Sequence, residues 1–314
     1  MKKIRLLASI FLIFSLTAAA HAAVFINIGT ATTGGTYYPV GAAMAKVWNG
    51  SIKDMRANAQ STGGTAQNLA LLGKEETEVI FADGLYYFAY EGKGAFEGKA
   101  MKGLRGLVPL YAEPIHFLVA KNSGINTIAD LKGKRVSVGA VGSGTEITVR
   151  TLLETAGLNP DKDIKAENLG LSDTASAFAD GNIDAALTVG AVGIAGVVEI
   201  TTMGTAGFRD IPDELVSALS KKLPYYLPFD IPAGTYKDQN APVKTLASWN
   251  VLITTDKLDE QLAYEMTKAL YEKKADIVNV SSRMSSMDAA NLQYIQIPLH
   301  PGAERYYKEI GAVK

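Results

Sequence analysis

Short β-rich segments alternate with helical patterns along this chain, and that alternation limits the folds open to it. In the first part, β-rich segments at residues 24–30, 56–59 and 79–82 are each followed by a loop and then by a helical pattern, at residues 38–48, 66–72 and 85–90. Consecutive β–loop–α units predict a parallel sheet covered by helices. We therefore expect an α/β fold.

The second part of the chain repeats this organisation. Strands are expected at residues 115–120, 136–138 and 183–189, and a helix through Leu153 with Gly157 as its stop. The proline-rich stretch 211–242 interrupts the pattern, and a strand at 249–254 and a helix at 260–273 resume it. This order indicates a return crossing between two α/β lobes, with residues 23–121 plus 246–314 in lobe one and 122–245 in lobe two.

Composition removes several classes of function. The chain has 314 residues, 31 basic against 32 acidic, and no cysteine. A balanced charge gives no broad positive field for a nucleic-acid backbone. The absence of cysteine excludes disulfide scaffolds, thiolate metal sites and cysteine nucleophiles. We expect a globular protein that does not bind nucleic acid.

The first 22 residues have the pattern of a secretory signal peptide. Lys2, Lys3 and Arg5 precede an apolar stretch that ends in small residues, and Ala20-His21-Ala22 fits a cleavage site. The apolar stretch is shorter than the roughly 20 residues of a membrane-spanning helix. Cleavage after Ala22 leaves 28 basic and 32 acidic residues, a net charge of −4. We expect an exported, periplasmic protein.

Three loops rich in Gly, Ser and Thr lie between expected strands and helices, at residues 32–36, 61–65 and 139–145. The third resembles a phosphate-binding loop, but Thr145 stands where that loop needs lysine, which makes ATP hydrolysis improbable. Each loop taken alone is either an anion site at a helix N-terminus or a turn with a helix cap. Together, at the carboxyl ends of strands in two lobes, they favour a ligand crevice between the lobes.

The sequence offers little for catalysis. After export the only histidines are His116, in an apolar strand, and His300, in a turn or at a helix start. We interpret His116 as a core or crevice-wall residue. No serine-hydrolase elbow, zinc-protease helix or calcium loop is present, so we expect no catalytic residues, no metal and no cofactor.

The loop motifs closely resemble those of the solute-binding proteins of the TAXI branch of tripartite ATP-independent periplasmic (TRAP) transporters. The resemblance is carried by residues 29–41, 61–64 with Asn68-Leu69, 113–116, 130–139, 142–146, 231–236 and 298–307. It implies a periplasmic-binding-protein-like fold of type II, in which two α/β lobes joined by hinge strands enclose a ligand cleft. It also implies a monomeric receptor for glutamate or a related carboxylate, which delivers its ligand to the membrane subunits of a TRAP permease.

The sequence differs from the family pattern at two places. Phe81-Ala82-Asp83 stands where a Gln-Ser-Asp-like triplet is expected, and Val189-Gly190-Ala191-Val192-Gly193 stands where a Gly–Ala–Pro loop is common. The alternative function is an exported α/β enzyme that acts on a small carboxylic acid. The expected ligand-binding residues are Thr33, Gly34, Gly35, Thr36, Tyr37, Ser61, Thr62, Asp83, Ser143, Gly144, Thr145 and Gly190.

Two roles follow for this set. No Lys or Arg lies within the three loops, so we expect neutral donors at helix N-termini to hold a ligand carboxylate, with Arg150 the nearest cation in sequence. Asp83 either pairs with a ligand ammonium group or caps the helix that begins near Leu85. The sequence leaves these two interpretations of Asp83 open.

Overall fold

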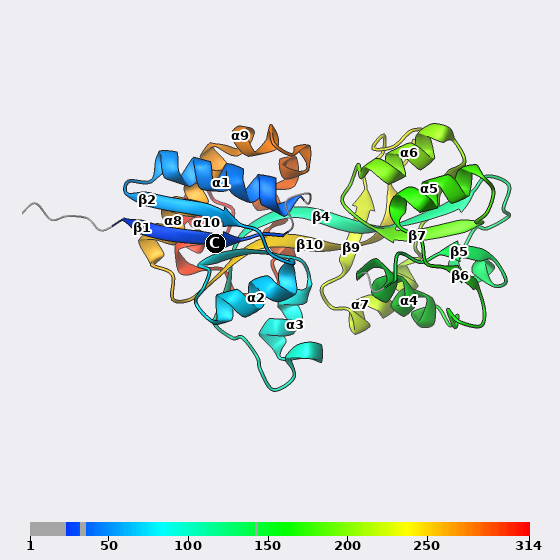
Figure 1. Cartoon of the computed structure of the whole chain (residues 1–314), viewed down its shortest axis with the longest axis horizontal. Coiled ribbons are helices and arrows are strands. Elements are labelled where there is room, and N and C mark those ends of the chain that lie inside the picture. The colour runs from blue at the N-terminus through cyan, green and yellow to red at the C-terminus, as the bar shows by residue number, and fades with distance from the viewer. Residues whose placement is uncertain (1–22, 32–35, 142–143) are drawn as a thin grey trace, which may run out of the picture.

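Two long strands join two α/β lobes in the computed structural model, which describes residues 23–31, 36–141 and 144–314. These strands are β4 (Leu104–Ala120) and β10 (Val243–Thr255), and Figure 1 shows them running from one lobe into the other. They pair antiparallel with each other. The strand order is β2-β1-β3-β10-β4-β7-β5-β6, with β8 on β4 and β9 on β10. Because both lobes share these strands, the sheet is continuous through the connection.

Lobe one is built on β1 (Val24–Gly29), β2 (Met55–Gln60) and β3 (Val79–Ala82), which are parallel. One face packs against α1, α8, α9 and α10, and the other against α2 and α3. Fully buried Trp48 on α1 belongs to the first of these cores. The helices are α1 (Tyr37–Ser51), α2 (Thr65–Gly73), α3 (Leu85–Glu91), α8 (Glu260–Glu272), α9 (Lys274–Val278) and α10 (Pro301–Glu309).

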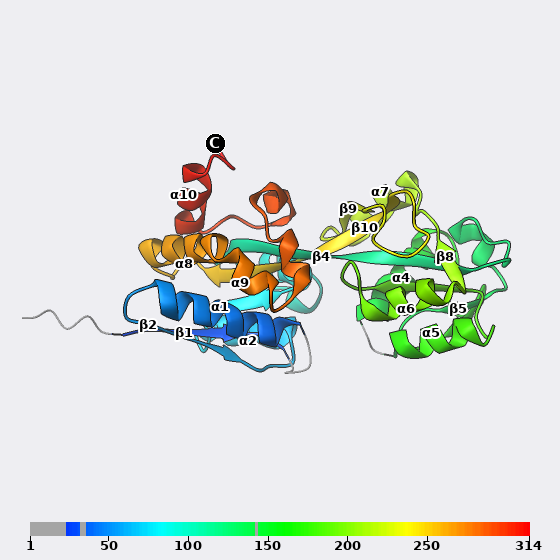
Figure 2. The ribbon, with the colours of Figure 1, turned by 90° about the horizontal axis from the view of Figure 1, so that it is seen from above.

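Lobe two has the same two-faced design. Helices α4 and α7 cover one face of its sheet, and α5 and α6 cover the other. Figure 2 shows this lobe beyond the long strands, at the end of the molecule away from α8 and α10. Its elements are β5 (Arg135–Ser137), α4 (Gly144–Thr155), β6 (Lys165–Glu167), α5 (Leu171–Ala179), β7 (Ala185–Val189), α6 (Ala195–Met203), β8 (Ala206–Phe208), α7 (Asp213–Lys222) and β9 (Leu227–Ile231).

The short 3₁₀ helices are η1 (Gly94–Phe96), η2 (Ile128–Leu131), η3 (Ser282–Ser286) and η4 (Ala289–Tyr294). Segment η3, near the end of the chain, returns to the start of α1, where its Arg283 is hydrogen-bonded to Thr36. Among the described residues, no helix has the length and apolar character needed to cross a bilayer.

The expected α/β fold and the parallel first strands are confirmed. The strand expected at residues 115–120 is the end of the much longer β4, and the proline-rich stretch 211–242 contains α7 and β9. Pro109 and Pro114 interrupt the apolar pattern of β4, which hides its length in the sequence. The signal peptide at residues 1–22 lies outside the described residues, and lobe boundaries at 121 and 246 remain predictions.

Candidate functional site

Asn68 ties together the loops that follow β1, β2 and β3. This fully buried amide donates to the carbonyls of Thr30 (2.7 Å) and Phe81 (2.9 Å), and its oxygen lies 2.7 Å from the Thr62 hydroxyl. The Thr62 hydroxyl also accepts from Gly64 N–H at 3.1 Å. Thr62 is therefore buried and engaged within lobe one, where it shapes the loop. Ser61 is exposed beside it and lies 3.1 Å from the Ala31 carbonyl.

Arg283 reaches this loop edge from the C-terminal part of the chain. Its guanidinium donates to the Thr36 hydroxyl at 2.5 Å, just before α1. Among the described residues Arg283 has no ion-pair partner. This cation was not among the residues predicted from the sequence, because it lies far along the chain from the three loops. A single Arg among serines at residues 281–286 was the available signal.

Tyr37, at the first turn of α1, donates its hydroxyl hydrogen bond to Asn250 on β10. Asn250 is fully buried and sits at a β-bulge, where the register between β10 and β4 shifts next to Tyr111. Bulges often re-aim side chains beside functional sites. Burial is the main cause that raises the pKa of Tyr37 well above its usual value, so this phenol stays protonated. Tyr37 is therefore fixed at the junction of the long strands.

Two carboxyl groups face the same junction. Asp83 follows β3, and one of its oxygens accepts from Leu85 N–H at 3.0 Å, which confirms its contact with the start of α3. Glu113 lies on β4 and is hydrogen-bonded to Asn250. Burial, followed by the charge of Asp83, raises the pKa of Glu113 to about 7, and burial also raises the pKa of Asp83. Glu113 belongs to a motif that carries the family resemblance, but no role was predicted for it from the sequence.

Lobe two presents the start of α4. Gly139 has φ +96°, and a Cβ there would come within 2.7 Å of Thr145 Cγ2, so this turn requires glycine. Gly144 and Thr145 lie in the first turn of α4, where backbone N–H groups have no acceptor within the helix and a helix can bind an anion. Arg150 is engaged elsewhere, since it bonds Glu146 (3.0 Å) and Asp161 (2.7 Å).

The loop after β7 is held by an aromatic pair. Tyr236 Oη lies 2.8 Å from His116 Nε2 and accepts from Gly193 N–H at 2.9 Å. His116 is fully buried, and burial lowers its pKa to about 4, so it is a neutral core residue. Gly190 is buried at the end of β7, where a Cβ would come within 2.6 Å of Ile194. His300 caps α10 by accepting from Gly302 N–H, which confirms the helix-start interpretation.

The two lobes touch beside this site. The ring of Tyr225, in lobe two, lies edge-on to Phe88 of α3 at 5.2 Å, and Gln296 donates to the Pro224 carbonyl at 2.6 Å. A pocket of about 130 Å³ lies between the lobes. It is lined by Tyr111, Ala112, Trp249, Ser282, Arg283, Ser285 and Ser286 from lobe one and by Ala191, Val192 and Phe229 from the lobe-two end.

The structure brings Thr36, Tyr37 and Asp83 to this junction, with Ser61 on the neighbouring loop. Gly144 and Thr145 lie at the start of α4, and Gly190 lies beside Ala191 of the pocket. Thr33, Gly34, Gly35 and Ser143 lie outside the described residues. Arg283, Glu113, Asn250 and the pocket position of Trp249 were not predicted from the sequence.

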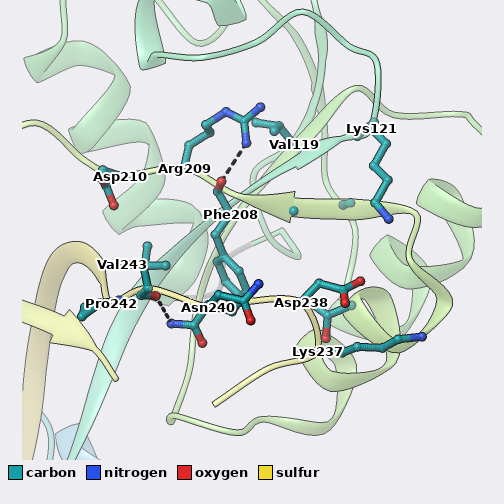
Figure 3. Close-up of a pocket in the computed structure, with 16 residues that line it drawn as sticks. Val119, Lys121, Phe208, Arg209, Asp210, Lys237, Asp238, Asn240, Pro242 and Val243 are labelled. Carbon is teal, nitrogen blue, oxygen red and sulfur yellow. Dashed lines mark hydrogen bonds between the residues drawn. The ribbon is translucent and has the colours of Figure 1, made fainter. Parts of the chain in front are cut away.

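A second pocket, of about 500 Å³, lies within lobe two, away from this junction (Figure 3). Lys121, Arg209, Lys237, Asp210 and Asp238 line it, so its charges are mixed. Arg209 is engaged, since it donates to the Phe208 carbonyl at 2.8 Å, the bond drawn in Figure 3. None of the expected ligand-binding residues that the structure describes lines this pocket; none lines the interlobe pocket either, but Gly190 directly precedes its Ala191. In the part of the chain that the structure describes, no group of three His, Asp or Glu side chains could hold a metal ion.

Solved structures with this fold include known binding proteins. A TctC solute binding protein from Polaromonas has a TM-score of 0.58 at 14% identity, covering 92% of this chain and 98% of its own. The periplasmic sulfonate-binding protein SsuA from Methylobacillus flagellatus has a TM-score of 0.52 at 14% identity, covering 92% and 87%. At such low identity these likenesses establish the fold alone, which is periplasmic-binding-protein-like. The model of the NMT1-like family matches residues 28–311, and this chain therefore belongs to the NMT1-like family.

Proposed function

We propose that this protein is an exported periplasmic receptor that captures a small carboxylate between its two lobes. The observation that carries the proposal is the pocket bounded by residues of both lobes, where β4 and β10 connect them. A ligand there contacts both lobes at once, so its binding stabilises their closed arrangement. The fold is shared with proteins named as solute-binding, which supports the same role.

Glutamate, or a related amino acid or dicarboxylate, is the proposed ligand. Among the described residues, Thr36, Ser61, Gly144 and Thr145 are the proposed neutral donors, and Thr33, Gly35 and Ser143 of the expected set stay predictions. Asp83 is hydrogen-bonded to Leu85 N–H and to the Thr65 side chain, and a carboxylate has about four lone-pair sites, so it can also accept from a ligand ammonium group. Thr62 acts through Asn68 and Gly64 by shaping the loop.

The proposed partners are the membrane subunits of a TRAP permease, to which a monomeric receptor delivers its ligand. This part of the proposal rests on the motif resemblance to TAXI proteins. The segment 1–22, interpreted as a cleaved signal peptide, supports the periplasmic location.

A ligand screen on the mature protein tests the receptor function. L-glutamate, 2-oxoglutarate and succinate are added separately, and melting temperature, tryptophan fluorescence and recovered ligand are measured. A receptor gains melting temperature and returns its ligand unchanged. Trp249 lines the interlobe pocket, whereas Trp48 is buried in lobe one and bonded to the Met266 carbonyl at 3.0 Å. We therefore expect the fluorescence change to come from Trp249. Steady loss of the added acid would instead support the exported enzyme.

A further inference from the structure

The interlobe pocket is lined by donors and lacks an acid. Its polar side chains are Tyr111, Trp249, Ser282, Arg283, Ser285 and Ser286. No carboxylate is among the described residues that line it. At about 130 Å³ it is smaller than the roughly 300 Å³ at which pockets for drug-sized ligands begin. The pocket therefore has the size and chemistry to hold one small anionic group.

Trp249 provides a second, independent observation at this pocket. Its side chain is 4% exposed, and its Nε1 has no hydrogen-bond acceptor among the described residues. The indole ring stacks on Tyr294 with centroids 4.2 Å apart and planes 9° from parallel, which fixes its orientation. An indole N–H can only donate, and a buried donor without an acceptor is unfavourable. Trp249 is one of the residues that line the pocket, so an unpartnered donor belongs to the wall of this site.

Arg283 supplies the positive charge in the lining of this pocket. Its bond to Thr36 uses one of its N–H groups, and a guanidinium has five, so others remain for a ligand. It lines the pocket between Ser282 and the serines at 285 and 286. Guanidinium groups bind carboxylates through two parallel hydrogen bonds, which fixes the position of the anion as well as its charge.

We infer that this pocket binds one carboxylate group of the ligand, held by Arg283 and by the indole N–H of Trp249. The inference rests on the proposed receptor function and names a binding site that the three loops do not contain. The C-terminal segment η3 is thus part of the ligand site.

Nitrogen-15 NMR of the two tryptophan indoles tests this assignment. The chain has two tryptophans, and the Trp48 indole, already bonded to Met266, is an internal reference. Acetate, succinate, 2-oxoglutarate and L-glutamate are titrated separately, with acetamide as the neutral analogue of acetate and sodium chloride matching the ionic strength. We expect the Trp249 signal to shift saturably with the carboxylates that raise the melting temperature. The Trp48 signal should stay in place, and acetamide should shift neither.

Three variants complete the test. Arg283→Gln should weaken carboxylate binding about 10-fold or more, and Trp249→Phe, which keeps the aromatic ring on Tyr294, about 3- to 10-fold. Arg56→Gln, on the exposed side of β2, should bind as the parent does. Circular dichroism checks the folding of each variant.

The results distinguish this inference from the receptor function. If a carboxylate raises the melting temperature but the Trp249 signal does not move, the receptor stands and the assignment of this pocket is overturned. Unchanged carboxylate affinity in Arg283→Gln would also overturn the assignment of this pocket and leave the receptor function standing. If no carboxylate changes either the melting temperature or the indole signal, both the carboxylate class and this pocket are wrong.

Discussion

Tyr225 of lobe two packs so closely on Gly84 of lobe one that a side chain at position 84 would displace it. A Cβ built on Gly84 would lie 2.5 Å from Cγ and 2.9 Å from Cβ of Tyr225. The backbone of Gly84 has φ −51°, which any residue adopts, so local geometry does not require glycine there. The close contact with Tyr225 of the opposite lobe is what requires glycine at this position.

Gly84→Ala should therefore weaken closure of the lobes while both lobes stay folded. Forced overpacking costs about 1–3 kcal/mol, and we expect a comparable loss in ligand-binding free energy. Calorimetry measures the affinity, and small-angle scattering should give a larger radius of gyration. Gly50→Ala is the control, because that helical position has open space around it. Equal affinity and equal size for Gly84→Ala and the parent would contradict this prediction.

Asp83→Asn separates the two roles of Asp83. Asparagine can still cap α3 through Leu85 N–H, so the stability of the protein should change little. An α-amino acid ligand should lose about 1.5–3 kcal/mol of binding free energy, because the charge facing its ammonium group is gone. The matching keto acid should lose almost nothing. Calorimetry with glutamate and 2-oxoglutarate checks this, and equal losses for both ligands would remove the ammonium role.

Thr145 and Arg150 should respond differently to truncation. Thr145→Ala removes a hydroxyl at the start of α4 and should cost about 0.5–1.5 kcal/mol of carboxylate binding. Arg150→Ala should leave affinity almost unchanged, because Glu146 and Asp161 already engage that guanidinium. Binding isotherms of the two variants decide the matter. Loss of binding in Arg150→Ala, with Ser143→Ala and Thr145→Ala unaffected, would show that the neutral donors are not the anion site.

Glu113 should make the unliganded protein less stable as the pH rises from about 4.5 to about 7. Its pKa is raised to about 7 in the folded state, so the folded protein holds a proton that the unfolded chain has released. Burial and then the charge of Asp83 raise this pKa, and Asn250 and Arg283 partly offset them, while the neighbouring phenols of Tyr37, Tyr111 and Tyr226 are neutral in this pH range. Glu113→Gln removes this titration and should be more stable than the parent at pH 8, by at most about 3 kcal/mol.

Urea unfolding at pH 5, 6, 7 and 8 measures this difference. His116, with its pKa lowered to about 4, favours the folded state as the pH rises toward 6.5, which is the opposite direction. It is present in both proteins and cancels in the comparison. Parallel stability curves for Glu113→Gln and the parent would exclude a buried titration at Glu113.

Asn68→Ala should destabilise lobe one by about 2–4 kcal/mol. The change leaves the buried Phe81 carbonyl and neighbouring loop carbonyls without their donor, and each unpaired buried group is costly. Ligand affinity should also fall, because the loops after β1, β2 and β3 lose their common anchor. Asn58→Ala is the control, since that amide is bonded only at the exposed surface. Thermal unfolding of the two variants should separate them clearly, and similar melting temperatures would argue against the anchor.

The sequence by itself determined the local elements and the general design of this protein. Strand periodicity and turn residues located β1, β2, β3 and their following helices, because those signals depend on neighbours within a few residues. Contacts of Asp83 with the start of α3 and of His300 with the start of α10 were among the alternatives open from the sequence, because each joins a side chain to an N–H two residues away.

Only the tertiary structure decided which distant residues share the site. Arg283 meets Thr36 across most of the chain, Glu113 meets Asn250 because β4 and β10 run antiparallel, and Tyr225 meets Gly84 because the lobes touch. No local propensity records such pairs, since each depends on how helices and strands pack. The sequence therefore indicated a cleft and the neutral loops at its edge, whereas packing placed the arginine, the second acid and the unpaired indole beside them.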